Sequence, residues 1–94
     1  MFYPNNTPLT ITLLENCTLG VIMTIEAEKA GRNDYPTHTM VVHDNLALRV
    51  EKALGLPTHP HEIASALMHL EKEGHIEMGQ TINDTYAKIK HSSL

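Results

Sequence analysis

The sequence predicts a small α+β domain with three helices, one short strand and a C-terminal β-hairpin. Apolar residues recur at helical spacing in three segments, and they alternate with polar residues in two short segments near the C-terminus. Gly31, Gly55 and Gly74 stand where the three helical segments end, and glycine commonly terminates helices. The length of 94 residues suits one compact domain.

Two patterns overlap near the N-terminus and leave the start of the first helix open. Thr7 and Pro8 are typical of a helix start, whereas residues 9–13 alternate as in a strand. Apolar residues within 18–30 share one helical face, which predicts a helix from Thr18 to Ala30. The alternative is a helix that begins at Ile11 or Leu13 and packs within the chain.

A short strand and a second helix follow the polar turn at residues 32–36. Residues 39–42 form a β-branched run, which favours a strand. Asp44 is a good N-cap, and apolar residues recur at helical spacing from there to Gly55. We therefore expect the second helix between Asp44 and Gly55.

The third helix is predicted to run from Pro60 to Glu73. Thr58 can cap it, and proline suits the first helical position. Its inward stripe consists of Ile63, Ala66, Leu67 and Leu70.

Residues 75–78 and 85–90 each alternate apolar with polar side chains, and a polar turn separates them. This pattern predicts a β-hairpin. The apolar side chains of its first strand should face the same side as either Tyr86 or Ile89, because the sequence leaves the register open.

Residues 39–90 resemble the winged helix-turn-helix domains of bacterial and phage regulators. Residues 44–57 look like the positioning helix, and residues 63–77 look like the recognition helix running into the first wing strand. The second segment carries the common pattern of Leu67, Leu70, Glu71 and Gly74 followed by a β-branched residue. The resemblance implies that residues 37–94 form a winged-helix core.

The resemblance also implies a function, which is the reading of duplex DNA by a transcriptional regulator or accessory factor. The helix at 60–73 would lie in the major groove, and the wing at 75–90 would touch the adjacent backbone or minor groove. Basic side chains nearby would contact phosphates. The expected DNA-binding residues are Thr58, His59, His61, Glu62, Ser65, His69 and Lys72 around the helix, Lys88 and Lys90 in the wing, and Arg49 and Lys52 in the preceding helix.

The charge of the chain weighs against strong DNA binding. The formal net charge is −4, and full protonation of the seven histidines would add seven positive charges near neutrality. The alternative function is therefore a winged-helix module that binds another protein and no DNA. Such a module should expose an apolar patch on the third helix or the N-terminal segment, whereas a DNA reader should gather its basic residues on one surface.

Other chemistry has little support in the sequence. His69 and Glu73 can share a helical face, but no two histidines show the spacing of a helical zinc motif, so we expect no metal and no cofactor. Cys17 is flanked by leucines and reads as an inert core thiol. The chain has no nucleophile elbow and no glycine-rich phosphate loop, so we expect no enzyme.

Residues 1–36 contain more apolar side chains than one helical face requires. We expect this segment to hold the first helix and a dimerisation element, which would make the protein a homodimer. No apolar run approaches the length of a membrane span, and the N-terminus lacks the features of a secretory signal. The cytoplasm is the expected location.

Overall fold

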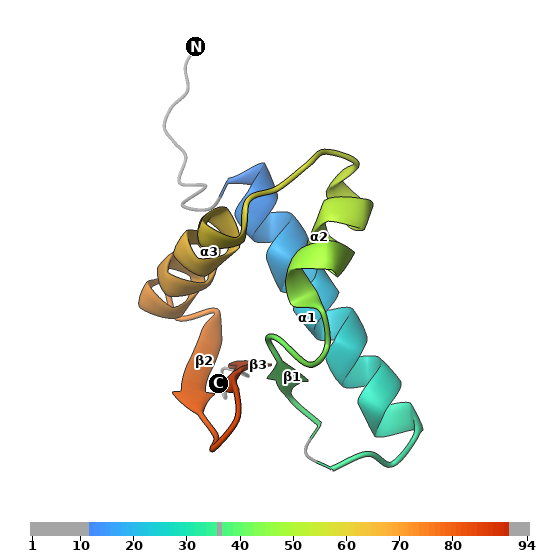
Figure 1. Ribbon diagram of the computed structural model, residues 1–94. Coiled ribbons are helices and arrows are strands. Elements are labelled where there is room, and N and C mark those ends of the chain that lie inside the picture. The colour runs from blue at the N-terminus through green and yellow to red at the C-terminus, as the bar shows by residue number, and fades with distance from the viewer. Residues whose placement is uncertain (1–11, 36, 91–94) are drawn as a thin grey trace.

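A computed structural model describes residues 12–35 and 37–90 of the chain. The elements are α1 (Leu13–Gly31), β1 (Thr39–Met40), α2 (Leu46–Leu54), α3 (Pro60–Lys72), β2 (Ile76–Gln80) and β3 (Thr85–Ile89), as Figure 1 shows. Within these described residues, the architecture is α+β with three helices and one three-stranded antiparallel sheet. The predicted order of helices, short strand and C-terminal hairpin is confirmed.

The three strands are ordered β1-β3-β2, so the first strand pairs with the last. Ile76 lies opposite Ile89, and Met78 lies opposite Ala87. This register answers the question that the alternating pattern left open. Ile76 and Ala87 are buried, so the apolar side of the hairpin faces the helices, and Tyr86 points to the other face of the sheet.

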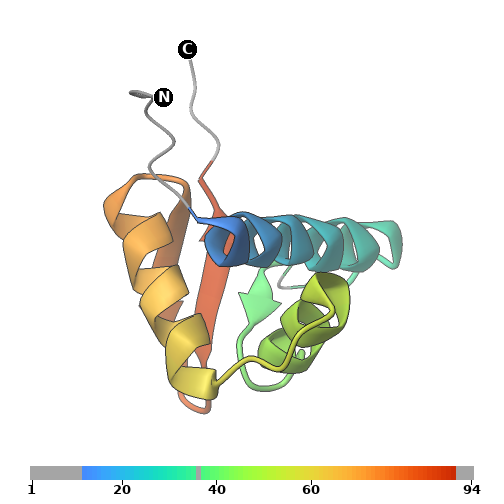
Figure 2. The same ribbon diagram turned by 90° about the horizontal axis from the view of Figure 1, so that it is seen from above.

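All three helices and the hairpin contribute to one hydrophobic core. α1 packs against α2, α3 and β3, and Figure 2 shows it running across the domain with α3 beside its N-terminal end and α2 beside its C-terminal half. The buried apolar side chains of this core are Ile22, Ile25, Leu46, Val50, Ile63, Leu67, Leu70, Ile76 and Ala87. Because no element buries its apolar face alone, the core holds the whole domain together.

The first helix is longer than its apolar face predicts. α1 begins at Leu13 rather than at Thr18, and Thr12 is its N-cap. The Thr12 hydroxyl accepts a hydrogen bond from the Glu15 N–H (3.1 Å), and the Glu15 carboxylate accepts one from the Thr12 N–H (3.0 Å). This reciprocal cap stabilises the first turn of α1, which the alternating pattern of residues 9–13 did not predict. The start at Leu13 agrees with the alternative given by the sequence. Thr7 and Pro8 lie outside the described residues.

Asp44 is not the N-cap of α2, and that prediction was wrong. Asn45 takes the N-cap position in the left-handed conformation, at a φ of 53°. The Asp44 carboxylate instead accepts hydrogen bonds from the buried Lys29 ammonium (2.6 Å) and the Met40 N–H (2.7 Å). The Asp44 side chain is therefore bound by Lys29 of α1 and does not cap α2.

Strand β1 is shorter than predicted, because it ends at Met40 instead of reaching Val42. The Asp84 carboxylate accepts the N–H groups of Val42 and His43, which turns the chain away from the sheet.

The start of α3 also differs from the prediction in one residue. His59, not Thr58, is the N-cap, and the Thr58 hydroxyl donates to the Leu56 carbonyl (3.1 Å). Pro60 is the first helical residue, as predicted. Gly55 and Gly74 adopt positive φ values of 80° and 83°, which explains why glycine ends α2 and follows α3.

Candidate functional site

One exposed face of α3 is a ridge made of His61, Ser65, Met68 and Lys72, which we call the α3 ridge. These positions are four, three and four residues apart, so they lie on one helical face, and all four side chains are exposed. The His61 ring lies near that of His59, with 5.0 Å between centroids. Three of the predicted DNA-binding residues of this helix, His61, Ser65 and Lys72, therefore share one surface.

The acidic residues of this region lie beside the ridge and not on it. The Glu62 carboxylate accepts a hydrogen bond from the His59 N–H (2.8 Å), so it serves the N-terminus of α3. An oxygen of Glu73 lies 3.6 Å from His69 Nε2. Glu71 is exposed, one turn after Leu67. None of the four residues of the α3 ridge is acidic, although Glu62 is exposed three residues before Ser65 and Glu71 is exposed next to Lys72.

His69 turns towards α1 and away from the ridge. Its Nδ1 atom lies 2.7 Å from Oε1 of Glu15, in the first turn of α1. Burial raises the pKa of the Glu15 carboxyl, but hydrogen bonds from Thr12 and His69 outweigh burial and leave this pKa below its ordinary value. His69 thus links the start of α1 to α3, and its ring is engaged by Glu15 although it is four residues after Ser65 and three before Lys72.

The two basic residues of α2 lie on a different surface. Arg49 forms an ion pair with Glu28 of α1 (3.1 Å). Lys52 lines a shallow depression with Arg49 and with Val21 and Thr24 of α1. The structure therefore places both beside α1 and does not bring them to the α3 ridge.

The basic residues of the hairpin belong to the outer face of the sheet. Lys88 is exposed and lies opposite Glu77 in the register, and Lys90 is exposed just after β3. On the same outer face the His38 ring packs against Tyr86, with 4.4 Å between centroids. Burial lowers the pKa of His38, and the charges of Lys29 and Lys88 lower it further.

The hairpin loop is held by a buried carboxylate that the sequence reading passed over as a turn residue. Asp84 accepts hydrogen bonds from the N–H groups of Val42, His43 and Thr85, and His43 Nδ1 lies 2.9 Å from it. Burial raises the pKa of Asp84, but these hydrogen bonds, led by that of the His43 N–H, leave it below its ordinary value. The loop is thus fixed to the β1–α2 turn, and Ile82 at its tip is fully exposed.

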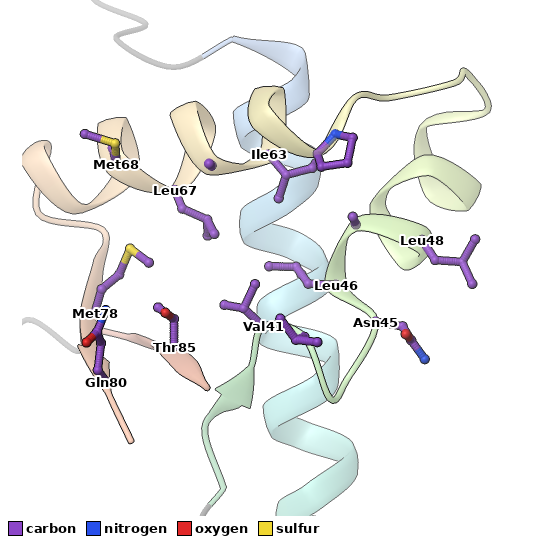
Figure 3. Close-up of a pocket in the computed structure, with 14 residues that line it drawn as sticks. Val41, Asn45, Leu46, Leu48, Ile63, Leu67, Met68, Met78, Gln80 and Thr85 are labelled. Atoms are coloured by element: carbon purple, nitrogen blue, oxygen red, sulfur yellow. The ribbon is translucent and has the colours of Figure 1, made fainter. Parts of the chain in front are cut away.

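A concave apolar surface lies between α3, the start of α2 and the hairpin, and we call it the apolar groove (Figure 3). Its volume is about 740 Å³. Its lining residues are Val41, Val42, Asn45, Leu46, Ala47, Leu48, Pro60, Ile63, Ala64, Leu67, Met68, Met78, Gln80 and Thr85. The sequence reading missed this groove. Its only sequence signal is that Val42, Leu48 and Met68 are apolar at positions outside the core-facing stripes.

Two other expectations concern metal and thiol chemistry. Within residues 12–35 and 37–90, no three histidine, cysteine or acidic side chains are grouped as metal ligands would be. Cys17 is half-buried against the core, and its Sγ lies 3.9 Å from the Val50 carbonyl oxygen. This position matches the expectation of a core thiol.

In the described part of the chain, no helix has the length and apolar character that crossing a bilayer requires. In comparisons with known proteins, no family model, no curated protein and no solved structure matches this chain.

Proposed function

We propose that this chain is a winged helix-turn-helix protein that binds duplex DNA and acts as a transcriptional regulator or accessory factor. α3 would enter the major groove, and the β2–β3 hairpin would approach the adjacent backbone or minor groove. The order of helices and strands, with β1 beside β3 and the hairpin after α3, is compatible with this arrangement.

The α3 ridge is the observation that carries the proposal. Three acidic residues in and just after α3 would repel phosphates if they lay on the reading surface. Glu62 contacts the His59 N–H and Glu73 lies near His69, so two of the three carboxylates have partners beside the ridge, and Glu71 is exposed next to Lys72. Ser65 can hydrogen-bond to base edges, and Lys72 can contact either a base or a phosphate.

The net charge of −4 limits the sequence-independent part of the affinity. The predicted DNA-binding residues Arg49 and Lys52 lie on the α1–α2 surface, whereas Lys88 and Lys90 lie on the outer face of the sheet. Binding should therefore be weak on random DNA, should fall steeply with salt, and should strengthen at pH 6, where histidines become protonated.

The test is a fluorescence-anisotropy titration of a mixed-sequence duplex at low salt, at pH 6 and at pH 8. We expect saturable binding that is tighter at pH 6. Lys72→Ala should weaken binding, whereas Arg32→Ala removes one positive charge from the surface ion pair with Asp34 and should not. On a selected site, Ser65→Ala should change base preference by about 1–3 kcal/mol.

The proposal fails if the duplex does not bind at either pH. If DNA binds but the Lys72→Ala and Arg32→Ala variants have equal affinities, the α3 ridge does not contact DNA.

A homodimer remains part of the proposal, because paired half-sites on DNA match two-fold symmetric proteins. On α1, Ile25 is buried within the chain, whereas Leu13 and Met23 remain exposed and could contact a second copy. Leu9 and Ile11 lie outside the described residues. Sedimentation velocity should detect a dimer that Met23→Lys weakens, and a monomer at high protein concentration would exclude it.

The second candidate is an interaction module that binds a protein and no DNA. The apolar groove favours it, because this surface lies between α3 and the hairpin, and none of the described residues in its lining is basic. A surface that spans a phosphate backbone normally carries Lys or Arg. Absence of DNA binding in the titration, together with occupancy of the groove, would support this candidate.

A further inference from the structure

The outer face of the sheet, opposite the core, holds a group of aromatic and basic side chains that we call the outer-face cluster. Its members are His38, Tyr86, Lys88 and Lys90. Side chains alternate between the two faces of a strand, so Tyr86 and Lys88 lie opposite the face that buries Ala87, and His38 lies opposite the face of Thr39. Lys90 continues this alternation, because its N–H donates to the His75 carbonyl (3.0 Å) and extends the ladder by one pair.

The Tyr86 ring lies flat against this face. A Cβ at Gly79 would be almost equally close to Oη, Cζ and Cε2 of Tyr86. A point that is nearly equidistant from three consecutive atoms of a planar group, at more than a bond length from each, lies above the plane of that group. One side of the ring therefore covers the glycine backbone, and the other side is directed away from the sheet. Tyr86 is half-buried, which agrees with a ring covered on one side.

His38 and Lys88 lie beside this ring. The His38 ring packs against it with 4.4 Å between centroids and 51° between the planes. Burial lowers the pKa of His38, and the charges of Lys29 and Lys88 lower it further, whereas the charge of Glu26 raises it. The positive charge of Lys88 is therefore close to the aromatic pair.

The charged side chains of this face favour an anionic ligand. Lys88 and Lys90 are exposed, and Glu77 is the acidic residue opposite Lys88 in the register. The Glu26 carboxylate accepts a hydrogen bond from the Ile89 N–H (2.7 Å), so it is bound to the edge of the sheet. Two residues of an extended strand span about 7 Å, so the two lysines can contact separate phosphates of one nucleic-acid strand.

An aromatic ring with an outward face, beside two ammonium groups, has the chemistry that binds single-stranded nucleic acid. An unpaired base can stack on the ring while neighbouring phosphates contact the lysines. In a duplex the bases are stacked on one another, and a side chain reaches the face of a base only if that base leaves the stack. The outer-face cluster therefore favours single strands over duplexes.

We propose that the outer-face cluster binds single-stranded DNA or RNA, with a base stacked on Tyr86 and the sugar–phosphate backbone along Lys88 and Lys90. Tyr86 takes no part in the proposed duplex contacts, so this site goes beyond the proposed function and can be tested separately from it.

The experiment is a fluorescence-anisotropy titration of labelled strands with the full chain at low salt. The probes are a pyrimidine DNA strand of about 10 nucleotides, the RNA strand of the same sequence, an abasic DNA strand of equal length, and the duplex. The pyrimidine DNA strand should bind at least about fivefold more tightly than the abasic strand, because only the former has bases that can stack. The tighter of the DNA and RNA strands identifies the preferred nucleic acid.

Substitutions separate the stacking contact from the charge contacts. Tyr86→Leu should weaken binding of the pyrimidine strand at least about fivefold, whereas Tyr86→Phe keeps the ring and should leave the Kd within about twofold. Lys88→Gln combined with Lys90→Gln should weaken binding of the pyrimidine and abasic strands alike. Arg32→Gln is the matched control for charge, because Arg32 is paired with Asp34, and it should change neither Kd.

Two further measurements locate the site. Amide chemical shifts of the labelled protein should change at Gly79, Tyr86 and Lys88 when the pyrimidine strand is added. Lys72→Ala, on the α3 ridge, should leave single-strand binding within about twofold, and Tyr86→Leu should leave duplex binding within about twofold.

The inference is overturned if neither single strand binds, or if the pyrimidine and abasic strands bind equally. It is also overturned if a folded Tyr86→Leu variant binds as tightly as the unsubstituted protein. Should Tyr86→Leu fail to fold, the chemical shifts of the unsubstituted protein decide, because changes confined to other surfaces contradict the proposal. Failure of the duplex to bind leaves this inference intact, so the two proposals fail separately.

Discussion

At the scale of single residues, three polar side chains connect elements that are far apart in the sequence. Lys29 is buried and joins α1 to Asp44 and to the His38 carbonyl. Asp84 holds the hairpin loop against the β1–α2 turn, and His69 joins α3 to Glu15. In each contact, polar groups are removed from water and form hydrogen bonds within the protein. Deleting one partner should therefore lower the free energy of unfolding.

Asp84→Asn should lower the free energy of unfolding by about 2 kcal/mol, because an amide cannot accept all the N–H donors that the carboxylate accepts. Asp34→Asn is the matched control, since Asp34 makes an exposed ion pair with Arg32 and should change stability little. Urea denaturation measures both. Equal effects of the two substitutions would contradict the connecting role of Asp84.

The same carboxylate should make stability depend on acid. The pKa of Asp84 is lower in the folded chain than in the unfolded chain, where it is near 4. Its contribution is therefore complete above about pH 4 and is lost as the pH falls through the lower folded value. Asp84→Asn should flatten the loss of stability below about pH 4. An unchanged acid profile would show that other carboxyl groups dominate it.

His69→Ala should lower the free energy of unfolding by about 1 kcal/mol, because it leaves the largely buried Glu15 carboxylate without one partner. His61→Ala, on the exposed α3 ridge, is its control and should be close to neutral. If the proposed function is correct, His61→Ala should affect DNA binding more than His69→Ala does, once both proteins are fully folded. A larger effect of His69→Ala on DNA binding would indicate that His69 contacts DNA and His61 does not.

At the scale of elements, the hairpin depends on one close contact between its strands. Gly79 of β2 lies opposite Tyr86 of β3, and a Cβ at Gly79 would overlap the Tyr86 ring. The tyrosine ring therefore covers the glycine backbone on the outer face of the sheet, beside His38. This contact favours the register in which Ile76 and Ala87 face the core.

Gly79→Ala should destabilise the protein by about 1–3 kcal/mol, because the added methyl group displaces the Tyr86 ring. Gly20→Ala is the control: it lies within α1 with open space around it, and it should stabilise by up to about 1 kcal/mol. Thermal unfolding measures both changes. Similar melting temperatures for the two variants would show that displacing the Tyr86 ring from Gly79 costs little free energy.

At the scale of the whole molecule, the shared core predicts one cooperative unfolding transition. Ile22 of α1 is fully buried among residues of α2, α3 and the hairpin. Ile22→Val should lower the free energy of unfolding by about 1 kcal/mol, with helical circular dichroism and hairpin amide signals shifting together. Ile82→Val, at the exposed loop tip, should leave the transition unchanged. Separate transitions for helices and hairpin would contradict a single core.

Local sequence signals determined most of the architecture. Apolar periodicity located the three helices, alternation located the hairpin, and Gly55, Pro60 and Gly74 marked boundaries that the structure confirms. These features depend on neighbouring residues and on backbone conformations that glycine and proline restrict or permit, so they can be read along the chain.

Only the tertiary structure decided which side chains are available for function. Asp44 pairs with Lys29 and does not cap α2, His69 contacts Glu15, and Arg49 pairs with Glu28. The apolar groove likewise needs α2, α3 and the hairpin together. These contacts join residues far apart in sequence, and their geometry follows from how the core packs, which no local pattern of residues encodes.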